Sequence, residues 1–340
     1  MKVLVTGASG FIGQHLVRAL SAQGHQVRYL LRPAASAPVN FNGRTQRVWG
    51  DMSDADSLHR AVEGVDQVYH LAAIRDRWGL SFKEYNTVNV QGTRHLLEAA
   101  ARQGARFIYC SSVGVLGYPG VLNIDESFDY RTRDGKFKYH HTKALSEQLT
   151  LAYARTGRLE ATVVRPVITY GPGDTYGMVT KLLTLLASGR FLPIGSGRNH
   201  VHLAYITDTV RGLILASESA QANGQVYILP GTRPITMQAL IDLASSVVDQ
   251  ATPGWHVPLA VAKTAAWLFE SAFALQRQLG LNLLGEEPFL TRDKIDTLTV
   301  NRGFDGTRAA TDLGYYPTID YAEGLAQTVA WARKAQLLPN

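Results

Sequence analysis

The sequence predicts an α/β fold: a Rossmann-type, doubly wound parallel sheet followed by a smaller C-terminal α/β lobe. Through the first half of the 340 residues, short apolar runs alternate with stretches of helical periodicity. The first run leads directly into a glycine-rich turn and an amphipathic stretch, "VLVTGASGFIGQHL" at residues 3–16. Strict alternation of strand and helix is typical of βαβ units, whose parallel sheet is covered by helices on both faces.

The expected elements follow in chain order. Strands are expected at residues 3–5, 27–31, 47–49, 68–71, 107–110, 161–165 and 226–229. Helices are expected at residues 11–22, 54–62, 90–103, 137–156, 178–188 and 237–248. After residue 165 the alternation loosens into turn-rich segments. We therefore place a Rossmann domain at 1–170 and a mostly substrate-binding lobe at 171–340, with crossovers of the chain back to the sheet.

Composition excludes several classes of protein. The chain is 46% hydrophobic and 18% charged, which is ordinary for a globular protein. Its net charge of +6 is scattered without a run of five like charges, so we expect no nucleic-acid partner but an anionic small ligand. The single cysteine, Cys110, excludes an intramolecular disulfide and indicates a reducing compartment, the cytoplasm. The chain has no signal-peptide core and no run of eighteen apolar residues, so a spanning helix is not expected.

Residues 258–284 are the most apolar stretch of the chain. Lys263, Glu270 and Arg277 interrupt it at sevenfold spacing, which gives one charged stripe and a broad apolar face. This pattern favours a helix packed in the core of the second lobe. Peripheral contact with a membrane surface, or with a partner protein, is the alternative.

The glycine-rich turn predicts a phosphate site. Gly7, Gly10 and Gly13 follow a strand and open a helix, which is the context that separates a phosphate cradle from a simple turn. Gly7 permits the tight turn, Gly10 lets the backbone approach a pyrophosphate, and Gly13 lets the helix pack close to the sheet. The free N–H groups at the start of the helix then face the phosphates.

The end of the second strand bears on the choice of cofactor. An NAD site usually presents a carboxylate here for the ribose 2′-hydroxyl, but Leu31 stands at that place and Arg32 follows it. An arginine can pair bidentately with a 2′-phosphate, so NADP is favoured, with NAD as the alternative.

Tyr139 and Lys143 form a candidate catalytic pair. In "YHHTK" they are four residues apart on a predicted helix and therefore share a face. A lysine ammonium lowers the pKa of a nearby phenol, which can then exchange a proton with a substrate oxygen. Ser111 or Ser112 in the preceding "YCSSVG" can hold the same oxygen. For His140 and His141, roles on the helix surface or in packing are favoured over catalysis. The other histidines show no metal-ligand spacing, so no metal site is expected.

These motifs resemble the extended short-chain dehydrogenase/reductase family, also described as NAD-dependent epimerase/dehydratase-like, over nearly the whole chain. Similar segments are "TGASGFIG", "GDMSD", "HLAA", "NVQGTRHLLEAA", "YCSSVGVLGY", "YHHTK" and "RPVITYGPGD". The "CSS" segment and Arg32 resemble the branch of dihydroflavonol reductases and 3β-hydroxysteroid dehydrogenases. The resemblance implies a catalytic triad of Ser112, Tyr139 and Lys143. It also implies cofactor contacts at Gly7, Ser9, Gly10, Phe11, Ile12, Gly13, Arg32, Asp51, Met52, Leu71, Ala72, Ala73, Asn89, Tyr139, Lys143, Pro166, Val167 and Ile168.

The family implies hydride transfer between a nicotinamide and a small-molecule ketone or secondary alcohol. Net NADP(H)-dependent redox chemistry is the favoured hypothesis. A cofactor-retaining nucleotide-sugar epimerase is the alternative, because "YGPGD" and "GSGRNHVHL" also fit such enzymes. A non-enzymatic dinucleotide sensor is disfavoured because Tyr139 and Lys143 are both kept. Relatives often form homodimers through the helices that carry Asn89 and Tyr139. Arg75, Arg77, Trp78 and Arg198 are expected either to border the substrate site or to be solvated surface residues.

Overall fold

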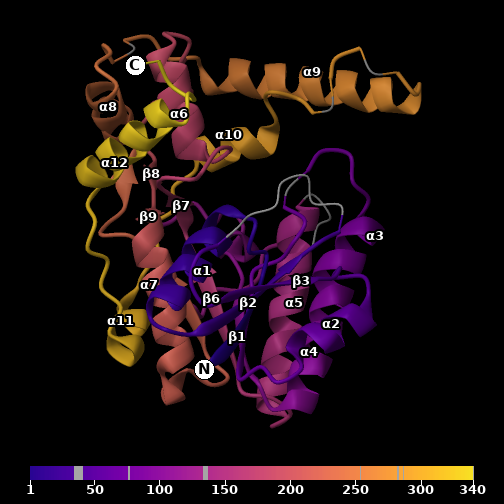
Figure 1. Cartoon of the computed structure of the whole chain (residues 1–340). Helices are drawn as coiled ribbons and strands as arrows, with labels where there is room; N and C mark the ends of the chain where they lie inside the picture. The colour runs from indigo at the N-terminus through magenta and orange to yellow at the C-terminus, as the bar shows by residue number, and fades with distance from the viewer. Residues whose placement is uncertain are drawn as a thin grey trace.

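A seven-stranded parallel sheet organises the molecule (Figure 1). The computed structural model describes residues 1–33, 41–75, 77–132, 137–252, 254–281, 283–285 and 287–339. Seven strands pair in the order β10-β6-β5-β4-β1-β2-β3, and each neighbouring pair is parallel. In chain order they are β1 (Lys2–Thr6), β2 (Gln26–Leu31), β3 (Thr45–Trp49), β4 (Gln67–His70), β5 (Arg106–Cys110), β6 (Ala161–Pro166) and β10 (Val226–Leu229). The predicted α/β class is confirmed.

Helices cover both faces of this sheet because successive side chains of a strand point to opposite sides. Val3 and Val5 of β1 belong to an apolar cluster with residues of α1 (Phe11–Ala22) and α7 (Ile206–Glu218). Leu4, between them, belongs to a second cluster, whose helices are α2 (Ala55–Val62), α4 (Gly92–Gln103) and α5 (Lys138–Arg155). Buried on both faces, the inner strands β1, β4, β5 and β6 show the near-continuous apolar runs from which they were predicted, whereas the edge strand β3 is largely exposed.

One irregular element precedes α4. The sequence predicts one helix over 90–103, but the chain first forms a short helix, α3 (Phe82–Tyr85), and a π-helical turn over Asn86–Gln91. A π-turn inserts an extra residue into the helical ladder and re-aims the side chains on it. Asn89 lies in this turn and is buried.

The C-terminal half contributes to the sheet as well as to a second lobe. β10 joins the sheet edge, and α7 packs against α1. The rest comprises the short strands β7 (Ile168–Tyr170), β8 (His200–Val201), β9 (Leu203–Tyr205) and β11 (Ile235–Thr236). Its helices are α6 (Met178–Ala187), α8 (Met237–Val247), α9 (Leu259–Gln278), α10 (Arg292–Thr299), α11 (Thr307–Leu313) and α12 (Tyr321–Lys334). The division at residue 170 stays a prediction.

The expectation of a core-packed helix over 258–284 is wrong. Residues 259–278 do form α9, and residue 282 lies outside the described residues. Of the side chains in α9, Ala262, Ala266 and Phe273 are the buried ones. The helix packs on α10 and runs across one end of the molecule, at the top of Figure 1. Among the described residues, no helix is both long and apolar enough to cross a membrane.

Candidate active site

The predicted site residues come together at the carboxyl ends of the strands, where doubly wound sheets bind their ligands. A cleft of about 710 Å³ opens there. Tyr139 and His140, in the first turn of α5, line it together with Arg77 and Trp78 from the loop after β4. Residues of α9, among them Glu270 and Arg277, and of the segment 287–294 line it too.

The glycine turn after β1 leaves bare backbone where a phosphate group would lie. Gly7 has a φ of +72°, and a Cβ there would lie 2.7 Å from the Ala72 nitrogen. A Cβ on Gly13 would lie 2.2 Å from the Gly7 carbonyl oxygen, so the first turn of α1 packs closely on the turn. Within the described residues, no side chain caps α1 at its N-cap residue Gly10, and its first turn holds no acid. The turn therefore fits a pyrophosphate.

A buried polar chain joins β1 to β4 beside this turn. The Thr6 hydroxyl lies 2.7 Å from His70 Nδ1, and His70 Nε2 lies 2.9 Å from the Thr93 hydroxyl. The Ala72 N–H donates to Thr6 Oγ1 at 3.2 Å, which holds the "HLAA" segment against the glycine turn. Burial lowers the pKa of His70 to about 3, so the ring is neutral. The bond from the Ala72 N–H to Thr6 places Leu71, Ala72 and Ala73 next to the glycine turn.

Arg32 and Asp51 meet at the ends of β2 and β3. Burial alone would raise the pKa of Asp51, but hydrogen bonds from Ser53 outweigh burial and, with the charge of Arg32, lower it. Asp51 is thus an anion, accepting from the Ser53 N–H at 2.8 Å and the Ser53 hydroxyl at 2.6 Å. Met52 is buried against Gly92 of α4. Arg32 is exposed and accessible to an anionic group of a ligand.

The structure separates the two serines after β5. Ser112 caps a 3₁₀ turn (Val113–Leu116), its Oγ accepting from the Gly114 N–H at 3.1 Å. Ser111 instead donates to Glu147 Oε2 at 2.7 Å, inside a buried cluster. In that cluster Arg165 Nη2 lies 2.5 Å from Glu147 Oε1, and both side chains are almost fully buried. Ser112 is therefore the serine whose hydroxyl is not held by a buried carboxylate.

Lys143 lies one helical turn after Tyr139 and is buried. Its Nζ donates to the carbonyl of Cys110, the last residue of β5, at 2.5 Å and lies 4.2 Å from the Tyr109 ring centre. Burial lowers the pKa of Lys143 to about 8, so its ammonium persists at neutral pH. The i, i+4 spacing puts Tyr139 and Lys143 on one face of α5, with the tyrosine at the cleft and the lysine behind it.

Asn89 ties the loop after β4 to the helix that carries Tyr139. Its Oδ1 accepts from the Ile74 N–H at 2.8 Å, and its Nδ2 donates to Thr142 Oγ1 at 3.1 Å. Thr142 lies between Tyr139 and Lys143. The π-turn therefore directs the Asn89 side chain so that it links the loop at Ile74 to α5 at Thr142.

The strand β6 ends at the remaining predicted contact segment. Pro166 is the last residue of β6 and Ile168 the first of β7, with Ile168 half-buried. Between them Val167 is buried and its N–H donates to the Leu229 carbonyl at 3.3 Å. That bond places Pro166 and Val167 at the same sheet edge as the residues above.

Some cleft residues were not predicted. Residues of α9 lie about 130 positions after Tyr139, and the sevenfold charged stripe that includes Glu270 and Arg277 did not connect them to the site. His140, for which a role on the helix surface or in packing was predicted, lines the cleft, and burial lowers its pKa to about 4. Of the four residues expected either to border the substrate site or to be solvated, Arg77 and Trp78 line the cleft. Arg75 and Arg198 are not among its lining residues.

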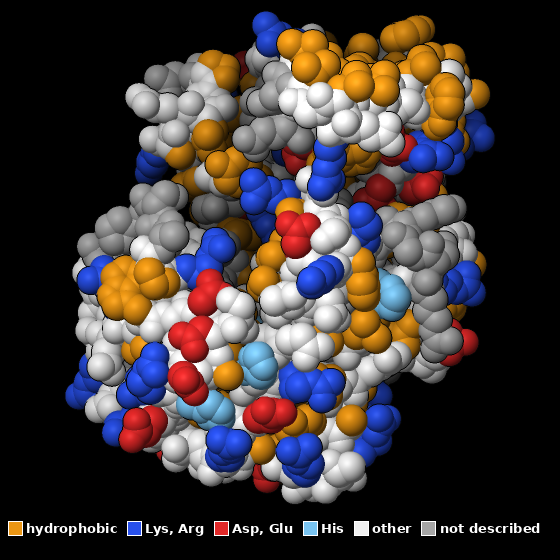
Figure 2. All heavy atoms as spheres, turned by 90° about the vertical axis from the view of Figure 1, so that its right-hand side faces the viewer, with side chains coloured by type: hydrophobic (Ala, Val, Ile, Leu, Met, Phe, Trp, Pro, Cys, Tyr) orange, Lys and Arg blue, Asp and Glu red, His pale blue; other side chains and the backbone are white. Residues whose placement is uncertain are grey.

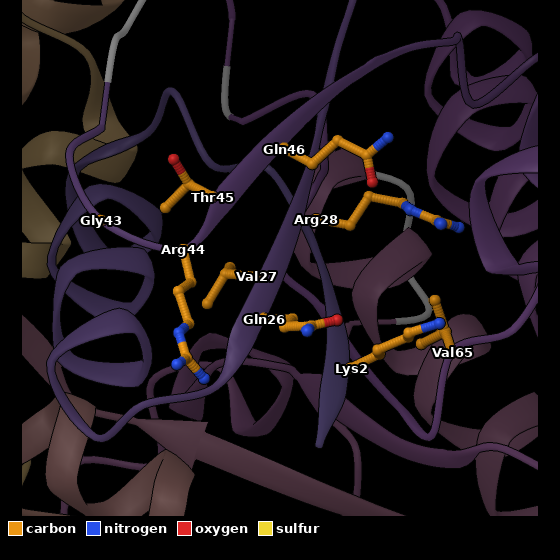
Figure 3. Close-up of a pocket in the computed structure, with 9 residues that line it drawn as sticks. All are labelled: Lys2, Gln26, Val27, Arg28, Gly43, Arg44, Thr45, Gln46 and Val65. Carbon is orange, nitrogen blue, oxygen red and sulfur yellow. The ribbon is translucent and has the colours of Figure 1, made fainter.

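A second hollow of about 450 Å³ lies at the opposite edge of the sheet (Figure 3). Lys2, Arg28 and Arg44 line it, close to the amino ends of β1, β2 and β3. Arg28 already donates to the carbonyls of Ala61 and Glu63, at 2.7 and 2.9 Å. This hollow shares no lining residue with the cleft at Tyr139. Within the described residues, no group of three or more His, Cys, Asp or Glu side chains is placed to hold a metal ion.

Comparison with known proteins agrees with this geometry. The sequence profile of the NAD dependent epimerase/dehydratase family matches residues 3–229, from β1 to the end of β10. The chain belongs to this family. Its members are extended short-chain dehydrogenases/reductases, so the chain is an NAD(P)-binding enzyme of that group.

Both kinds of enzyme named in the branch that the sequence resembles are found among the relatives. The chain is 31% identical over 358 residues to an Arabidopsis thaliana 3β-hydroxysteroid-dehydrogenase/decarboxylase, covering 96% of this chain and 78% of that protein. It is 32% identical over 335 residues to a putative dihydroflavonol 4-reductase of Synechocystis, covering 96% and 93%. The crystal structure of gox2253 superposes with a TM-score of 0.81 at 28% identity, covering 99% of both chains.

Proposed function

We propose that the protein is an NADP(H)-dependent oxidoreductase that interconverts a ketone and a secondary alcohol. The observation that carries the proposal is the pairing on α5. A tyrosine faces a cleft at the carboxyl edge of a Rossmann sheet, and a buried lysine lies one turn behind it. The names of the two relatives above, a hydroxysteroid dehydrogenase and a dihydroflavonol reductase, support this class of reaction.

The residues around the glycine turn would hold the dinucleotide. Gly7, Gly10 and Gly13 with the start of α1 would take the pyrophosphate, and Asp51 and Met52 the adenine end. The loops at Leu71–Ala73 and Pro166–Ile168 would lie along the rest. When bound, this group donates or accepts the hydride. We propose that Arg32 selects NADP by pairing with the 2′-phosphate.

The chain itself handles the proton. In the reductive direction the Tyr139 hydroxyl donates its proton to the carbonyl oxygen, and in the oxidative direction the phenolate takes it back. The Lys143 ammonium stabilises the phenolate electrostatically. Ser112 donates a hydrogen bond to the same oxygen and orients it. Asn89 acts as a positioning residue, since it holds α5 against the loop at Ile74.

Replacing Tyr139 with Phe tests the assignment. Screening NADPH oxidation against ketones first identifies a turned-over substrate. Tyr139→Phe is then expected to lower kcat roughly 10²- to 10⁴-fold with little change in KM for the cofactor. Tyr176→Phe is the matched control, because Tyr176 is 72% exposed. An intact rate in Tyr139→Phe would refute the triad.

The same assay separates net redox chemistry from epimerisation. A reductase consumes one NADPH for each product molecule, whereas the alternative, a nucleotide-sugar epimerase, turns over with catalytic cofactor. Arg32→Ser tests the cofactor preference, because loss of a charged contact to the 2′-phosphate is expected to weaken NADP binding about 10- to 100-fold and leave NAD binding unchanged. Equal loss for both cofactors would assign Arg32 another role.

We further propose that two copies pair through α4 and α5, and that the enzyme works in a reducing compartment such as the cytoplasm. The first rests on the family resemblance, and the second on the buried, unpaired thiol of Cys110. Light scattering on the purified protein tests the dimer.

A further inference from the structure

The outward face of α9 is an apolar seam that nothing in the described chain covers. Val261, Ala265, Leu268, Ala272 and Leu275 recur at spacings of four and three residues and so share one side of the helix. Val261, Leu268 and Leu275 are 58%, 56% and 55% exposed. A helix in the interior of a lobe would bury this side, but here its three buried residues lie on another side.

The apolar surface extends beyond the helix. Exposed large apolar side chains flank the seam before α9, on its sides and after it: Trp255, Trp267, Phe269, Leu279, Leu281, Leu283, Leu284 and Phe289. Figure 2 shows apolar side chains as a band across this end of the molecule, with Lys and Arg side chains at its margins. We call the seam and these flanking residues the α9 patch. Monomeric proteins rarely leave so many large apolar side chains together in water.

The charged stripe of α9 holds the helix in this orientation. Lys263 Nζ lies 3.2 Å from Asp296 Oδ1 of α10, and Arg292 Nε lies 2.7 Å from Glu270 Oε2. Arg277 donates to the carbonyl of Gly79, in the loop beside the cleft. All three charges of the stripe therefore point toward the protein. Rolling the helix to hide its apolar seam would break all three contacts.

The extent of the patch argues against a second copy as the occupant. A helix of 20 residues is roughly 30 Å long and about 10 Å wide, so a helix-to-helix contact covers roughly 300 Å² on each copy. A stable dimer needs about 800 Å² on each partner. A flat, deformable phase covers the whole patch without needing a complementary shape.

Charge and composition favour a lipid surface. Each ion pair beside the patch joins one carboxylate to one cation, Asp296 to Lys263, Glu270 to Arg292 and Glu287 to Lys294, so these pairs add no net charge of either sign. The chain as a whole carries a net charge of +6, which attracts anionic lipid head groups. Two tryptophans, at 63% and 52% exposure, suit the boundary between head groups and acyl chains.

We propose that the α9 patch docks the protein on the surface of an anionic phospholipid bilayer, with α9 lying in the plane of the interface. The inner side of the same helix lines the catalytic cleft through Glu270, Ala274 and Arg277. Docking therefore brings the wall of the cleft within about one helix diameter of the lipid. The docking does not depend on the proposed reaction.

Vesicle flotation of the full chain tests the docking. Vesicles of phosphatidylcholine with phosphatidylglycerol are expected to carry the wild-type protein upward, and vesicles of phosphatidylcholine alone to carry less. Leu268→Gln with Leu275→Gln is expected to lower the bound fraction about tenfold or more, because two leucine side chains no longer enter the apolar phase. Trp49→Gln with Val121→Gln is the matched control, since both residues are exposed apolar side chains elsewhere. Circular dichroism checks that each variant is folded.

A second measurement locates the contact. Brominated acyl chains are expected to quench tryptophan emission in the wild type, and Trp255→Phe with Trp267→Phe to remove that quenching. Failure of the wild type to float with either vesicle overturns the proposal, as does equal flotation of the Leu268/Leu275 variant. A wild-type dimer that this variant dissociates, without lipid binding, would assign the patch to a second copy instead.

Discussion

In α5 and α9, the two longest described helices, burial does not follow polarity. α5 buries polar residues against the sheet, including Thr142, Lys143, Ser146, Glu147 and Thr150. α9 instead leaves Val261, Leu268 and Leu275 in contact with water. Neither helix has the simple arrangement of an apolar side facing in and a polar side facing out.

The difference lies in what each helix faces. The polar groups of α5 have partners across the interface: Glu147 meets Arg165, Lys143 meets the carbonyl of Cys110, and Ser146 donates to the Asn89 carbonyl at 2.8 Å. The charges of α9 also have partners on the inner side, so its apolar residues are left outside. Burial follows the available partners rather than the residue class alone.

Among the variants of α5 and α9, loss of the Glu147 carboxylate is expected to lower stability the most. Glu147→Ala leaves the Arg165 guanidinium buried without its carboxylate, so we expect the free energy of unfolding to fall by about 3 to 5 kcal/mol. Chemical denaturation measures it. Glu160→Ala is the control, since Glu160 pairs with Arg106 at 3.0 Å but is 62% exposed, and we expect a loss under about 1 kcal/mol. Similar losses in both variants would contradict the role given to burial.

Replacing Lys143 with Met separates stability from activity on the same helix. In the unfolded chain Lys143 has a pKa of about 10.5. In the folded protein its pKa is about 8, so the side chain loses its proton at a lower pH. Below pH 8 the fold therefore bears the full cost of burying the ammonium, about 3 kcal/mol by the shift in pKa. We expect Lys143→Met to be more stable than the wild type by up to about that amount at pH 7, and inactive.

The pH dependence checks the sign of that prediction. Between pH 8 and 10.5 the unfolded chain binds more protons than the folded one, so the stability of the wild type rises with pH. The gap between Lys143→Met and the wild type should therefore be largest below pH 8 and close by pH 10.5. A gap that widens with pH would show that the lysine is not buried as a cation.

Shortening Phe273 tests the inner side of α9. Phe273 is 6% exposed, so Phe273→Ala removes a buried ring and should lower the free energy of unfolding by roughly 3 kcal/mol. Thermal unfolding followed by circular dichroism measures it. A negligible change would mean that α9 is not packed on this side in solution.

Changing Leu268 tests the outer side with the smallest expected effect. Leu268 is 56% exposed, so Leu268→Gln should change the free energy of unfolding by less than about 0.5 kcal/mol in the absence of lipid. The same denaturation measurement as for Phe273→Ala applies. A loss as large as that of Phe273→Ala would show that a partner already covers this side.

Much of the fold and of the site could be predicted from the sequence. The helix at 11–22 agrees with α1 at both ends, because an apolar strand, a glycine turn and a helical period follow each other without interruption. The strand-end residues Arg32, Asp51 and Leu71 could be placed near one another, since parallel strands end at one edge of a sheet. The π-turn at Asn89 could not, because its bonds go to Ile74 and Thr142 on other segments.

By itself the sequence determined the individual strands, the glycine turn and the spacing of Tyr139 and Lys143, because each depends on residues within a few positions of one another. Tertiary structure decided which side of α9 faces water. The same sevenfold stripe of Lys263, Glu270 and Arg277 is compatible with either orientation. The charged partners at Asp296 and Arg292 and the carbonyl of Gly79 lie far away in the chain, and only folding brings them to the stripe and turns the apolar side outward.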